Sequence, residues 1–414
     1  MNILFLSEVS AVEVIGGAER VLREQALGLH RCGHQVNIVA RAPAADTRPT
    51  VVIDGVTELR YPVSRGSAIA FAWSSAQGAY QAVCHLAALR EPDALIMHQA
   101  LPGLRPVLHR AGTRPALIYV CHSLAHEEFL SRNASDAEGI TTLAYTGHAL
   151  VRRSLERFIV RRCNCVVVLS DFMKQRVMQA HGVSADRIRI IPGAADLDRF
   201  YPVLDRAAAR SRVALPADRI LLFTVRNLVS RMGLEALVTA IAALQGEFPG
   251  LLLLIGGEGP LRATLEAQIL ERGLKDRVRL LGFIAEKELP LYYQAADLVL
   301  MPTKALEGFG LVTVEALACG APVLGTPVGA IPEILTQVDP VLVAEGSDAP
   351  ALARAIGTLL RRFRAEPGLR QRLATIGRRL AETQYNWPRH VERLEAVLQG
   401  SLDERQSHPC DHPT

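Results

Sequence analysis

Short apolar runs alternate with amphipathic helical patterns along the whole chain. This alternation is typical of parallel sheets covered by helices on both faces, so it predicts an α/β fold. The strand candidates in the first half are residues 2–6, 35–40, 94–98, 116–120, 166–170 and 188–191. Those in the second half are residues 220–225, 251–255, 278–282, 297–302 and 321–325. Each series can form one open sheet, and we therefore expect two Rossmann-like halves.

The length of the chain also suits two domains, because 414 residues exceed the usual domain size of about 100–200. A polar, arginine-rich stretch near residues 200–212 marks the expected boundary. The pattern predicts an N-terminal domain over 1–203, a C-terminal domain over 204–384, a helix over 385–400 that can cross back to the first domain, and a disordered tail over 401–414.

The formal net charge is only +4, and nucleic-acid binding usually requires a concentrated basic face, so we expect no nucleic-acid partner. Nearly all of the basic residues are arginines, which reflects either a coding bias or sites for oxyanions that a guanidinium group grips in two places. The helix candidate VRRSLERFIVRRC (151–163) has a mixed face suited to anionic lipid, and a solvated flank is the alternative.

The features that indicate a compartment point to the cytoplasm. The seven cysteines are scattered, without zinc or thioredoxin spacing, which is typical of reduced thiols. The N-terminus MNILFLSEVS has no basic region and predicts a first strand instead of a signal peptide. No apolar run approaches the roughly 18 residues that span a bilayer. We expect a cytoplasmic protein, with peripheral association at the inner face of the membrane left open.

Two loops that follow predicted strands carry residues suited to phosphate. In an open α/β sheet, ligands bind beyond the carboxyl ends of the strands. Gly16 and Gly17 open a helix whose N–H groups can approach an anion, although a purely structural turn would also need glycine. Arg226 and Arg231 follow strand 220–225 and suit a diphosphate, with two solvated arginines as the alternative.

Two shorter patterns are weak evidence for a ligand. Gly257-Glu258-Gly259 lacks the third glycine of the dinucleotide fingerprint, as does the N-terminal loop, which argues against a nicotinamide enzyme. Asp196-Leu197-Asp198 matches the minimal Asp-x-Asp pattern of metal-dependent sugar transferases, but three residues match readily by chance. We therefore expect no metal site.

The most specific stretch is EGFGLVTVEALAC, residues 307–319. Glu307 precedes a Gly-Phe-Gly turn, and Glu315 lies about one turn inside the helix that follows. Gly308 and Gly310 let the backbone approach a ligand, and a carboxylate can accept hydrogen bonds from two neighbouring hydroxyls such as a ribose diol. A surface loop with an incidental helix glutamate would explain only one of these features.

With these motifs the chain resembles the retaining glycosyltransferases of family 4, whose GT-B fold has two Rossmann-like parallel-sheet domains facing across a cleft. The resemblance covers about residues 1–398. Its strongest part, residues 307–335, is similar to the family's Glu-x7-Glu signature and the proline-glutamate segment that follows it. Further matches lie at residues 16–39, 170–177, 191–202, 256–262 and 280–303.

The resemblance implies a role for each matching position. Glu315 would bind the ribose of a nucleotide-sugar donor, Glu307 would hold the transferred sugar, and Arg226 would neutralise the leaving diphosphate. His122, at the end of strand 116–120, would lie near the anomeric centre, and His98 ends the neighbouring strand similarly. The implied donor-binding residues are Gly16, Gly17, Arg226, Arg231, Gly257, Phe283, Glu307, Gly308, Phe309, Gly310, Leu311 and Glu315. The implied catalytic residues are His122, Arg226, Arg231 and Glu307.

Two positions depart from the family pattern. The family's phosphate loop has a lysine directly before its glycine, whereas this chain has Met232 before Gly233. Arg231, one residue earlier, either takes over the charge of that lysine or points elsewhere, which puts donor affinity in doubt. Gly193 stands where the family often has asparagine.

The resemblance implies a hexosyltransferase-type enzyme that moves a sugar from a nucleoside diphosphate to an acceptor hydroxyl with retention, in the synthesis of cell-surface glycans or glycolipids. The acceptor would be a sugar, a lipid-linked glycan or a small molecule. We expect no metal and no cofactor beyond the nucleotide-sugar co-substrate, since arginines and helix N-termini can stabilise the departing diphosphate. A sugar-nucleotide epimerase of the same fold and a non-catalytic nucleotide-sugar-binding subunit are the alternatives.

Overall fold

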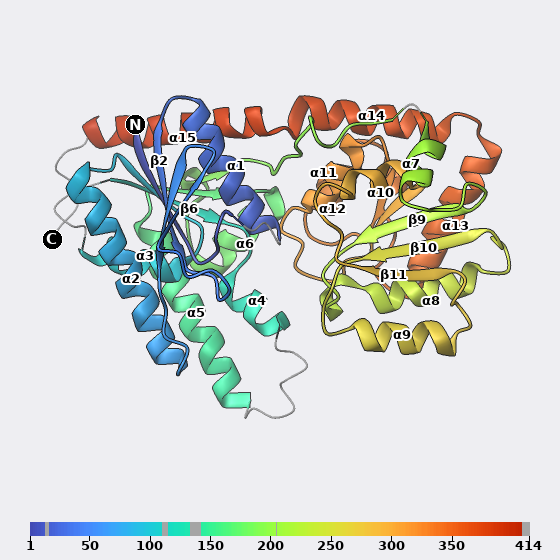
Figure 1. The fold of residues 1–414 in the computed structure, drawn as a ribbon, viewed down its shortest axis with the longest axis horizontal. Helices are drawn as coiled ribbons and strands as arrows, with labels where there is room; N and C mark the ends of the chain where they lie inside the picture. Colours follow the sequence, from blue (N-terminus) through green and yellow to red (C-terminus); the bar gives the residue numbers. More distant parts are fainter. Residues whose placement is uncertain (13–15, 110–114, 133–141, 204, 408–414) are drawn as a thin grey trace. The chain divides into compact units, whose positions relative to one another are not determined.

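The computed structural model describes residues 1–12, 16–109, 115–132, 142–203 and 205–407 (Figure 1). The chain forms two compact units, and we describe each by itself. Unit 1 comprises Met1–Pro192 and Trp387–Thr414, and unit 2 comprises Gly193–Asn386. None of the helices in the described ranges combines the length and apolar character needed to cross a membrane.

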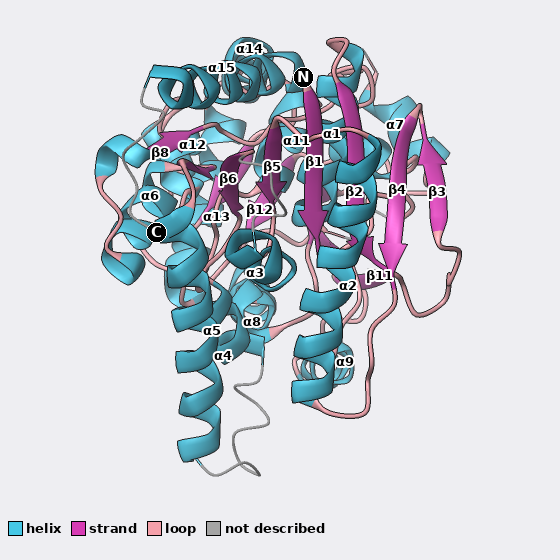
Figure 2. Ribbon diagram, turned by 90° about the vertical axis from the view of Figure 1, so that its left-hand side faces the viewer, coloured by secondary structure: helices cyan, strands magenta, loops and turns pink. Residues whose placement is uncertain are grey.

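Unit 1 is built on one sheet of eight strands. These are β1 (Asn2–Ser7), β2 (Gln35–Arg41), β3 (Thr50–Ile53), β4 (Val56–Tyr61), β5 (Ala94–Met97), β6 (Ala116–Cys121), β7 (Cys165–Val168) and β8 (Ile188–Ile190). Their order is β3-β4-β2-β1-β5-β6-β7-β8, and all neighbours are parallel except β3 and β4. Figure 2 shows β3 at the edge of the sheet beside β4.

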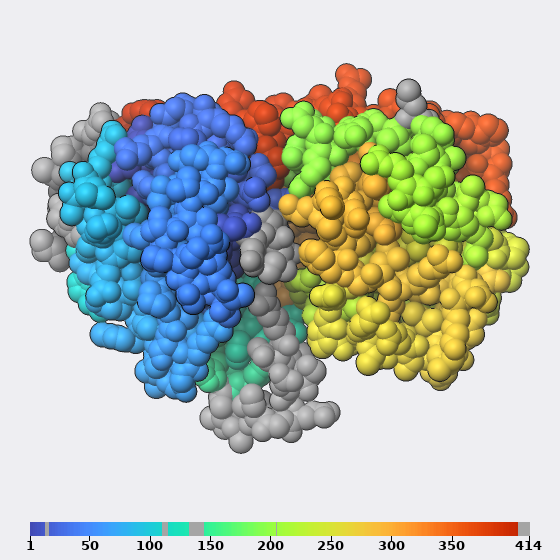
Figure 3. All heavy atoms as spheres, viewed as in Figure 1, coloured from blue at the N-terminus to red at the C-terminus, as the bar shows by residue number. Residues whose placement is uncertain are grey.

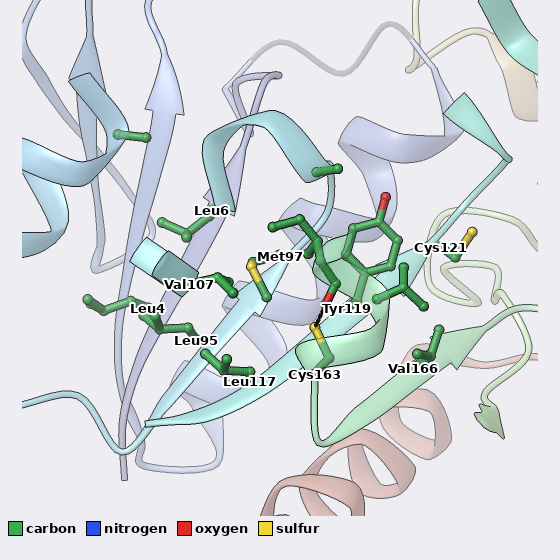
Figure 4. Close-up of a cluster of buried hydrophobic side chains, with 14 of the residues drawn as sticks. Leu4, Leu6, Leu95, Met97, Val107, Leu117, Tyr119, Cys121, Cys163 and Val166 are labelled. Atoms are coloured by element: carbon green, nitrogen blue, oxygen red, sulfur yellow. Dashed lines mark hydrogen bonds between the residues drawn. The ribbon is translucent and has the colours of Figure 1, made fainter. Parts of the chain in front are cut away.

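Alternate residues of the central strands point to opposite faces of this sheet, because successive side chains in a strand alternate. Leu4, Leu95 and Leu117 contribute to one buried cluster (Figure 4). Ile3 and Ile96 contribute to the cluster on the other face. Both faces are therefore covered, as the continuous apolar runs predict.

Helices cover both faces of the sheet of unit 1. They are α1 (Gly17–Arg31), α2 (Ala68–Leu89), α3 (Ala100–His109), α4 (Ala125–Arg132), α5 (Thr142–Arg162), α6 (Asp171–His181) and α15 (Trp387–Ser407). Residues of α2, α3, α5 and α6 pack on the first cluster, and residues of α1 and α15 pack on the second. The C-terminal helix α15 thus belongs to unit 1, where it lies beside α1 (Figure 1).

The helix α15 also corrects the expected start of the tail. Residues 401–407 are helical instead of disordered. Ser401 is buried, and Leu402 packs against the second cluster, so apolar contact extends the helix beyond the predicted end. Residues 408–414 lie outside the described residues.

Unit 2 is a second α/β layer structure with a fully parallel sheet. Its strands are β9 (Ile220–Val225), β10 (Leu251–Gly256), β11 (Val278–Gly282), β12 (Leu298–Met301) and β13 (Val323–Gly325), in the order β11-β10-β9-β12-β13. Its helices are α7 (Arg206–Arg212), α8 (Leu234–Leu244), α9 (Arg262–Glu271), α10 (Leu289–Ala295), α11 (Leu311–Ala318), α12 (Ile331–Leu335), α13 (Ala349–Ala365) and α14 (Leu369–Gln384). In the space-filling view, green, yellow and orange segments that precede α13 cover the visible face of unit 2 (Figure 3).

The strand order of unit 2 reverses between β9 and β12. From β9 the chain proceeds to β10 and β11 on one side, and it then returns to β12 and β13 on the other. Neighbouring loops leave the sheet in opposite directions at such a switch point, which opens a place for a ligand beyond the carboxyl ends of the strands. The loops after β9 and β12 are therefore the first place to look for a site in this unit.

The segment before α7 packs with unit 2. Arg378 on α14 donates a hydrogen bond to the backbone carbonyl of Phe200, at 2.8 Å. A Cβ atom added to Gly193 would lie 2.6 Å from the ring of Phe309. The crossing from unit 1 to unit 2 accordingly comes at Pro192, ahead of the expected boundary at residue 203.

Candidate functional site

A buried ion pair joins the two loops at the switch point of unit 2. Arg226 follows β9 directly, and its guanidinium group donates to the carboxylate of Glu307, in the loop after β12. The hydroxyl of Thr303 lies between them, 3.2 Å from Nη2 of Arg226 and 3.1 Å from Oε2 of Glu307. The two charged side chains are only 6% and 11% exposed. Each charge therefore compensates the other in a place where an unpaired charge would be costly.

Met232, which stands where the family pattern has a lysine, contacts the arginine of this ion pair. The thioether sulfur of Met232 lies 3.2 Å from Nε and 2.9 Å from Nη2 of Arg226, and the sulfur of Met301 lies 3.8 Å from Nη1. Sulfur is a weak acceptor, so these contacts occupy the guanidinium N–H groups without binding them strongly. A lysine in place of Met232 would instead bring a second positive charge toward Arg226.

Arg231 points toward the loop that carries Glu307. Its Nη1 donates to the backbone carbonyl of Leu306, at 3.1 Å. The backbone N–H of Lys304 in turn donates to the carbonyl of Arg231, at 2.8 Å. These two hydrogen bonds, both made by Arg231, join the loop after β9 to the loop after β12.

Backbone hydrogen bonds also join the ends of β9, β10 and β11 next to Arg226. Arg226 N–H donates to the carbonyl of Gly256 at 3.0 Å, and Gly257 N–H donates to the carbonyl of Gly282 at 2.7 Å. Gly257 has φ 118, and an added Cβ would lie 2.0 Å from the carbonyl oxygen of Arg226, so only glycine fits there. Phe283, which follows β11, is 66% exposed.

The glycine turn and the helix α11 place Glu315. Gly310 has φ 87 and caps α11, in which Glu315 is the fifth residue. The carboxylate of Glu315 is buried and accepts a hydrogen bond from the hydroxyl of Tyr293, at 3.2 Å. Phe309 is buried with its ring 5.7 Å from that of Tyr385, so its backbone is the part that remains for a ligand.

Two histidines lie at neighbouring strand ends of unit 1. His98 follows β5 and His122 follows β6, and Nδ1 of His98 lies 2.9 Å from Nε2 of His122. Burial lowers the pKa of His122 to about 4 and lowers that of His98 well below its ordinary value. Both imidazoles are therefore neutral at pH 7. Gly16 is the N-cap of α1 and Gly17 its first residue, whereas residues 13–15 of the same loop lie outside the described residues.

A buried glutamate that the sequence pattern does not single out holds the loop after β1. Glu58, on β4, is fully buried and accepts hydrogen bonds from the hydroxyl of Ser10 and the N–H of Ala11, both at 2.7 Å. Arg60 pairs with the same carboxylate at 2.7 Å. This ion pair anchors the chain that leads to the glycines of α1. The alternation in TVVIDGVTELRY (50–61) could have indicated the hairpin that carries it.

Two family models together match most of the chain. A model described as Glycosyltransferase Family 4 matches residues 15–199, and one described as Glycosyl transferases group 1 matches residues 205–379. The GDP-mannose-dependent alpha-(1-6)-phosphatidylinositol monomannoside mannosyltransferase of Mycolicibacterium smegmatis is 32% identical over 264 residues, which cover 62% of this chain and 68% of the relative. The chain belongs to glycosyltransferase family 4.

A longer sequence alignment supports the same assignment, and solved structures share the fold. The D-inositol 3-phosphate glycosyltransferase of Saccharomonospora viridis is 28% identical over 406 residues, which cover 94% of this chain and 90% of the relative. Among solved structures, sucrose-phosphate synthase from Thermosynechococcus elongatus has a TM-score of 0.81 at 24% identity and covers 98% of this chain and 100% of its own. Anabaena HepE in complex with UDP has a TM-score of 0.74 at 19% identity and covers 97% and 100%.

The family resemblance and the α/β GT-B fold that the motifs predict are confirmed, and the protein is a glycosyltransferase. In this family 4 glycosyltransferase, the structure brings Arg226, Arg231 and Glu307 together at the switch point. The parts that these and the other expected site residues play in binding and catalysis remain predictions.

The Asp-x-Asp pattern at residues 196–198 and the glycine at position 193 have structural explanations. Oδ1 of Asp196 accepts hydrogen bonds from the backbone N–H groups of Asp198 at 3.1 Å and Arg199 at 3.3 Å. In the described part of the chain, no three His, Cys, Asp or Glu residues are grouped as metal ligands would be. At Gly193 an added Cβ would also lie 2.7 Å from the side chain of Leu311, so a larger residue would require Phe309 and Leu311 to move.

Proposed function

We propose that this family 4 glycosyltransferase transfers a hexose from a nucleoside diphosphate to an acceptor hydroxyl with retention of configuration. The observation that carries the proposal is the buried pair of Arg226 and Glu307 at the switch point of unit 2. A cation and an oxygen acceptor there match the two ends of a sugar diphosphate, since one can bind phosphate and the other can bind sugar hydroxyls.

In the proposed mechanism, the diphosphate replaces weak partners of Arg226. Its contacts with the sulfurs of Met232 and Met301 are exchanged for charge-assisted hydrogen bonds to phosphate oxygens, which are shorter and stronger. Glu307 stays paired with Arg226 and Thr303 through Oε2, and its other oxygen, Oε1, can accept hydrogen bonds from the sugar. As the bond to the diphosphate breaks, Arg226 and the N–H groups at the start of α11 stabilise the charge on the leaving group.

Glu315 takes the nucleoside end of the donor in this proposal. Its carboxylate is buried on α11 and is oriented by the hydroxyl of Tyr293. A carboxylate held in this way can accept hydrogen bonds from both hydroxyls of a ribose. Gly257 and Phe283, at the ends of β10 and β11, are the other candidates for contact with the donor.

The acceptor that we propose is a phosphorylated or lipid-linked polyol or glycan. The relatives of this chain include a phosphatidylinositol monomannoside mannosyltransferase and a D-inositol 3-phosphate glycosyltransferase. On α5, Leu150 and Val151 are 60% and 67% exposed next to Arg152 and Arg153, which suits peripheral contact with an anionic membrane surface.

The proposal is tested by a donor screen followed by product analysis. Thermal shifts with UDP, GDP, ADP and their common sugar conjugates identify the donor, and NMR of the transferred sugar gives the anomeric configuration. Transfer with the donor's configuration is expected. An inverted product would refute the mechanism, and release of an isomerised nucleotide sugar without an acceptor would favour an epimerase.

Turnover is expected to survive removal of divalent cations. The positive charge at the proposed diphosphate site comes from Arg226 and Arg231, so no metal is needed to neutralise the leaving group. The initial rate of transfer should be the same after dialysis against EDTA. Loss of activity that Mg²⁺ or Mn²⁺ restores would contradict this expectation.

The two glutamates are expected to respond differently to replacement by glutamine. Glu315→Gln should weaken binding of the intact donor and of the sugar-free nucleoside diphosphate equally, by roughly 10- to 150-fold, because each loses a charge-assisted hydrogen bond of about 1.5–3 kcal/mol. Glu307→Gln should lower turnover without weakening binding of the sugar-free diphosphate, because the part of the donor that Glu307 is proposed to bind is the sugar. Calorimetric titration of both variants with both ligands measures the difference, and identical profiles would disprove the division.

A further inference from the structure

A continuous chain of hydrogen bonds crosses the interior of unit 1 and ends at His122. Nε2 of His122 lies 2.9 Å from Nδ1 of His98, and Nε2 of His98 lies 3.1 Å from the amide oxygen of Gln25 on α1. The amide nitrogen of Gln25 lies 2.9 Å from Nε2 of His390 on α15. Nδ1 of His390 lies 2.7 Å from the backbone carbonyl of Pro192.

The carbonyl at the end of this chain determines the direction of every bond in it. A carbonyl oxygen only accepts, so Nδ1 of His390 carries the hydrogen, and Nε2 of the neutral ring accepts. The amide nitrogen of Gln25 then donates to His390, and its oxygen accepts from Nε2–H of His98. Nδ1 of His98 is left as an acceptor, which requires the hydrogen of His122 on Nε2.

Burial in the interior of unit 1 keeps the chain of hydrogen bonds in this single arrangement of donors and acceptors. Gln25, His98 and His390 are 0%, 3% and 2% exposed, so solvent cannot replace the partners. Burial lowers the pKa of His390 to about 4, as it does that of His122, and the three rings are therefore neutral at pH 7. The helix that carries His390 is packed closely on α1, since a Cβ added to Gly28 would lie 2.3 Å from Val391.

We infer that Gln25 and His390 are positioning residues that hold His122 as its Nε2–H tautomer and so present Nδ1 as a hydrogen-bond acceptor for a substrate hydroxyl. The inference rests on the proposed function in one respect, namely that His122 contacts the substrate. It has a consequence for specificity. A hydroxyl can donate to Nδ1, whereas a carboxylate or carbonyl at the same place can only accept and would be rejected.

Two substitutions of His390 test whether this residue controls the tautomer of His122 or only fills space in the core. His390→Leu removes the donor to Pro192 and lets the amide of Gln25 turn round, so His98 and His122 lose their fixed tautomers. His390→Gln can donate to the same carbonyl and accept from Gln25, so it retains the direction of the chain. Neither residue contacts the substrate in the inference, and backbone NMR spectra of both variants establish that they fold.

The measurement is the long-range ¹H–¹⁵N correlation spectrum of histidine-labelled full-length protein without ligands. The expected tautomers in the unsubstituted protein are Nε2–H for His98 and His122 and Nδ1–H for His390. In His390→Leu, His122 should show a mixture of tautomers, and kcat/KM should fall roughly 3- to 10-fold, the worth of about one neutral hydrogen bond. His390→Gln should retain the Nε2–H tautomer of His122 and most of the activity.

An Nδ1–H tautomer of His122 in the unsubstituted protein would overturn the inference. So would a single Nε2–H tautomer of His122 in His390→Leu, or equal losses of kcat/KM in the two variants. Because the spectra are recorded without substrate, they test the hydrogen-bond chain by itself. Absence of transfer with every donor of the screen would instead contradict the proposed function.

Discussion

Arg226→Ala is expected to lower turnover by roughly 10²- to 10³-fold and to destabilise unit 2 by about 3–5 kcal/mol. The first effect follows from losing the cation that stabilises the leaving diphosphate. The second follows because the carboxylate of Glu307 is left buried without its counter-charge, with the hydroxyl of Thr303 as its remaining hydrogen-bond partner among the described residues. Steady-state kinetics and urea denaturation measure the two effects on one preparation.

A double variant separates these two effects. In Arg226→Met with Glu307→Gln, neither charge is present: glutamine has the shape of glutamate, and methionine is an unbranched, uncharged side chain shorter than arginine. Replacing a buried ion pair by neutral groups is often close to neutral for stability, so the stability should return while turnover stays low. A double variant as unstable as Arg226→Ala, or one with restored turnover, would show that the pair has another role.

Gly329→Ala is expected to destabilise the protein by about 2–5 kcal/mol and to disturb the loop of Glu307. Gly329 has φ 62, and an added Cβ would lie 2.0 Å from the carbonyl oxygen of Glu307. The next N–H, that of Ala330, donates to this same oxygen at 3.0 Å, so the backbone cannot yield without losing that bond. The estimate combines about 1–2 kcal/mol for a left-handed alanine with about 1–3 kcal/mol for overpacking.

Gly273→Ala is the matched control for this variant. Gly273 has φ 66 and nothing within 4 Å of an added Cβ, so alanine there has the cost of the backbone conformation, about 1–2 kcal/mol, without a clash. Urea denaturation should show a larger loss of stability in Gly329→Ala than in Gly273→Ala. Transfer activity should fall in Gly329→Ala alone. Equal stabilities of the two variants would mean that the backbone moves the added Cβ away from the carbonyl oxygen of Glu307 with no loss of stability.

Most strands of the two sheets could be predicted because they are buried on both faces. A strand buried on both faces reads as a continuous apolar run, as LLLLI (251–255) does, and such runs are visible without knowledge of their neighbours. The hairpin of β3 and β4 is half polar and has no such run. Its signal is the Asp54-Gly55 turn, with φ 46 and 89, between two short strands.

The candidate site could be predicted only where its residues follow strands in the sequence. Arg226 and Glu307 stand at recognisable strand ends, but a pattern cannot show that they pair across 81 positions of chain. The chain of hydrogen bonds from Gln25 to His390 spans 365 positions and joins helices whose sequences look like ordinary packing faces. Such pairs form only when the chain folds, and no local sequence pattern predicts which residues will pair.

The position of α15 has a consequence for synthesis on the ribosome. Unit 2 is one continuous segment, Gly193–Asn386, whereas the core of unit 1 includes Val391, Leu394 and Leu398 at the far end of the chain. Domains generally fold as they emerge, N-terminal first. Here that order is reversed: the unit that starts first is completed last, and α1 keeps an uncovered apolar face until its C-terminal partner leaves the exit tunnel. A nascent chain stalled before α15 exposes that face to chaperones.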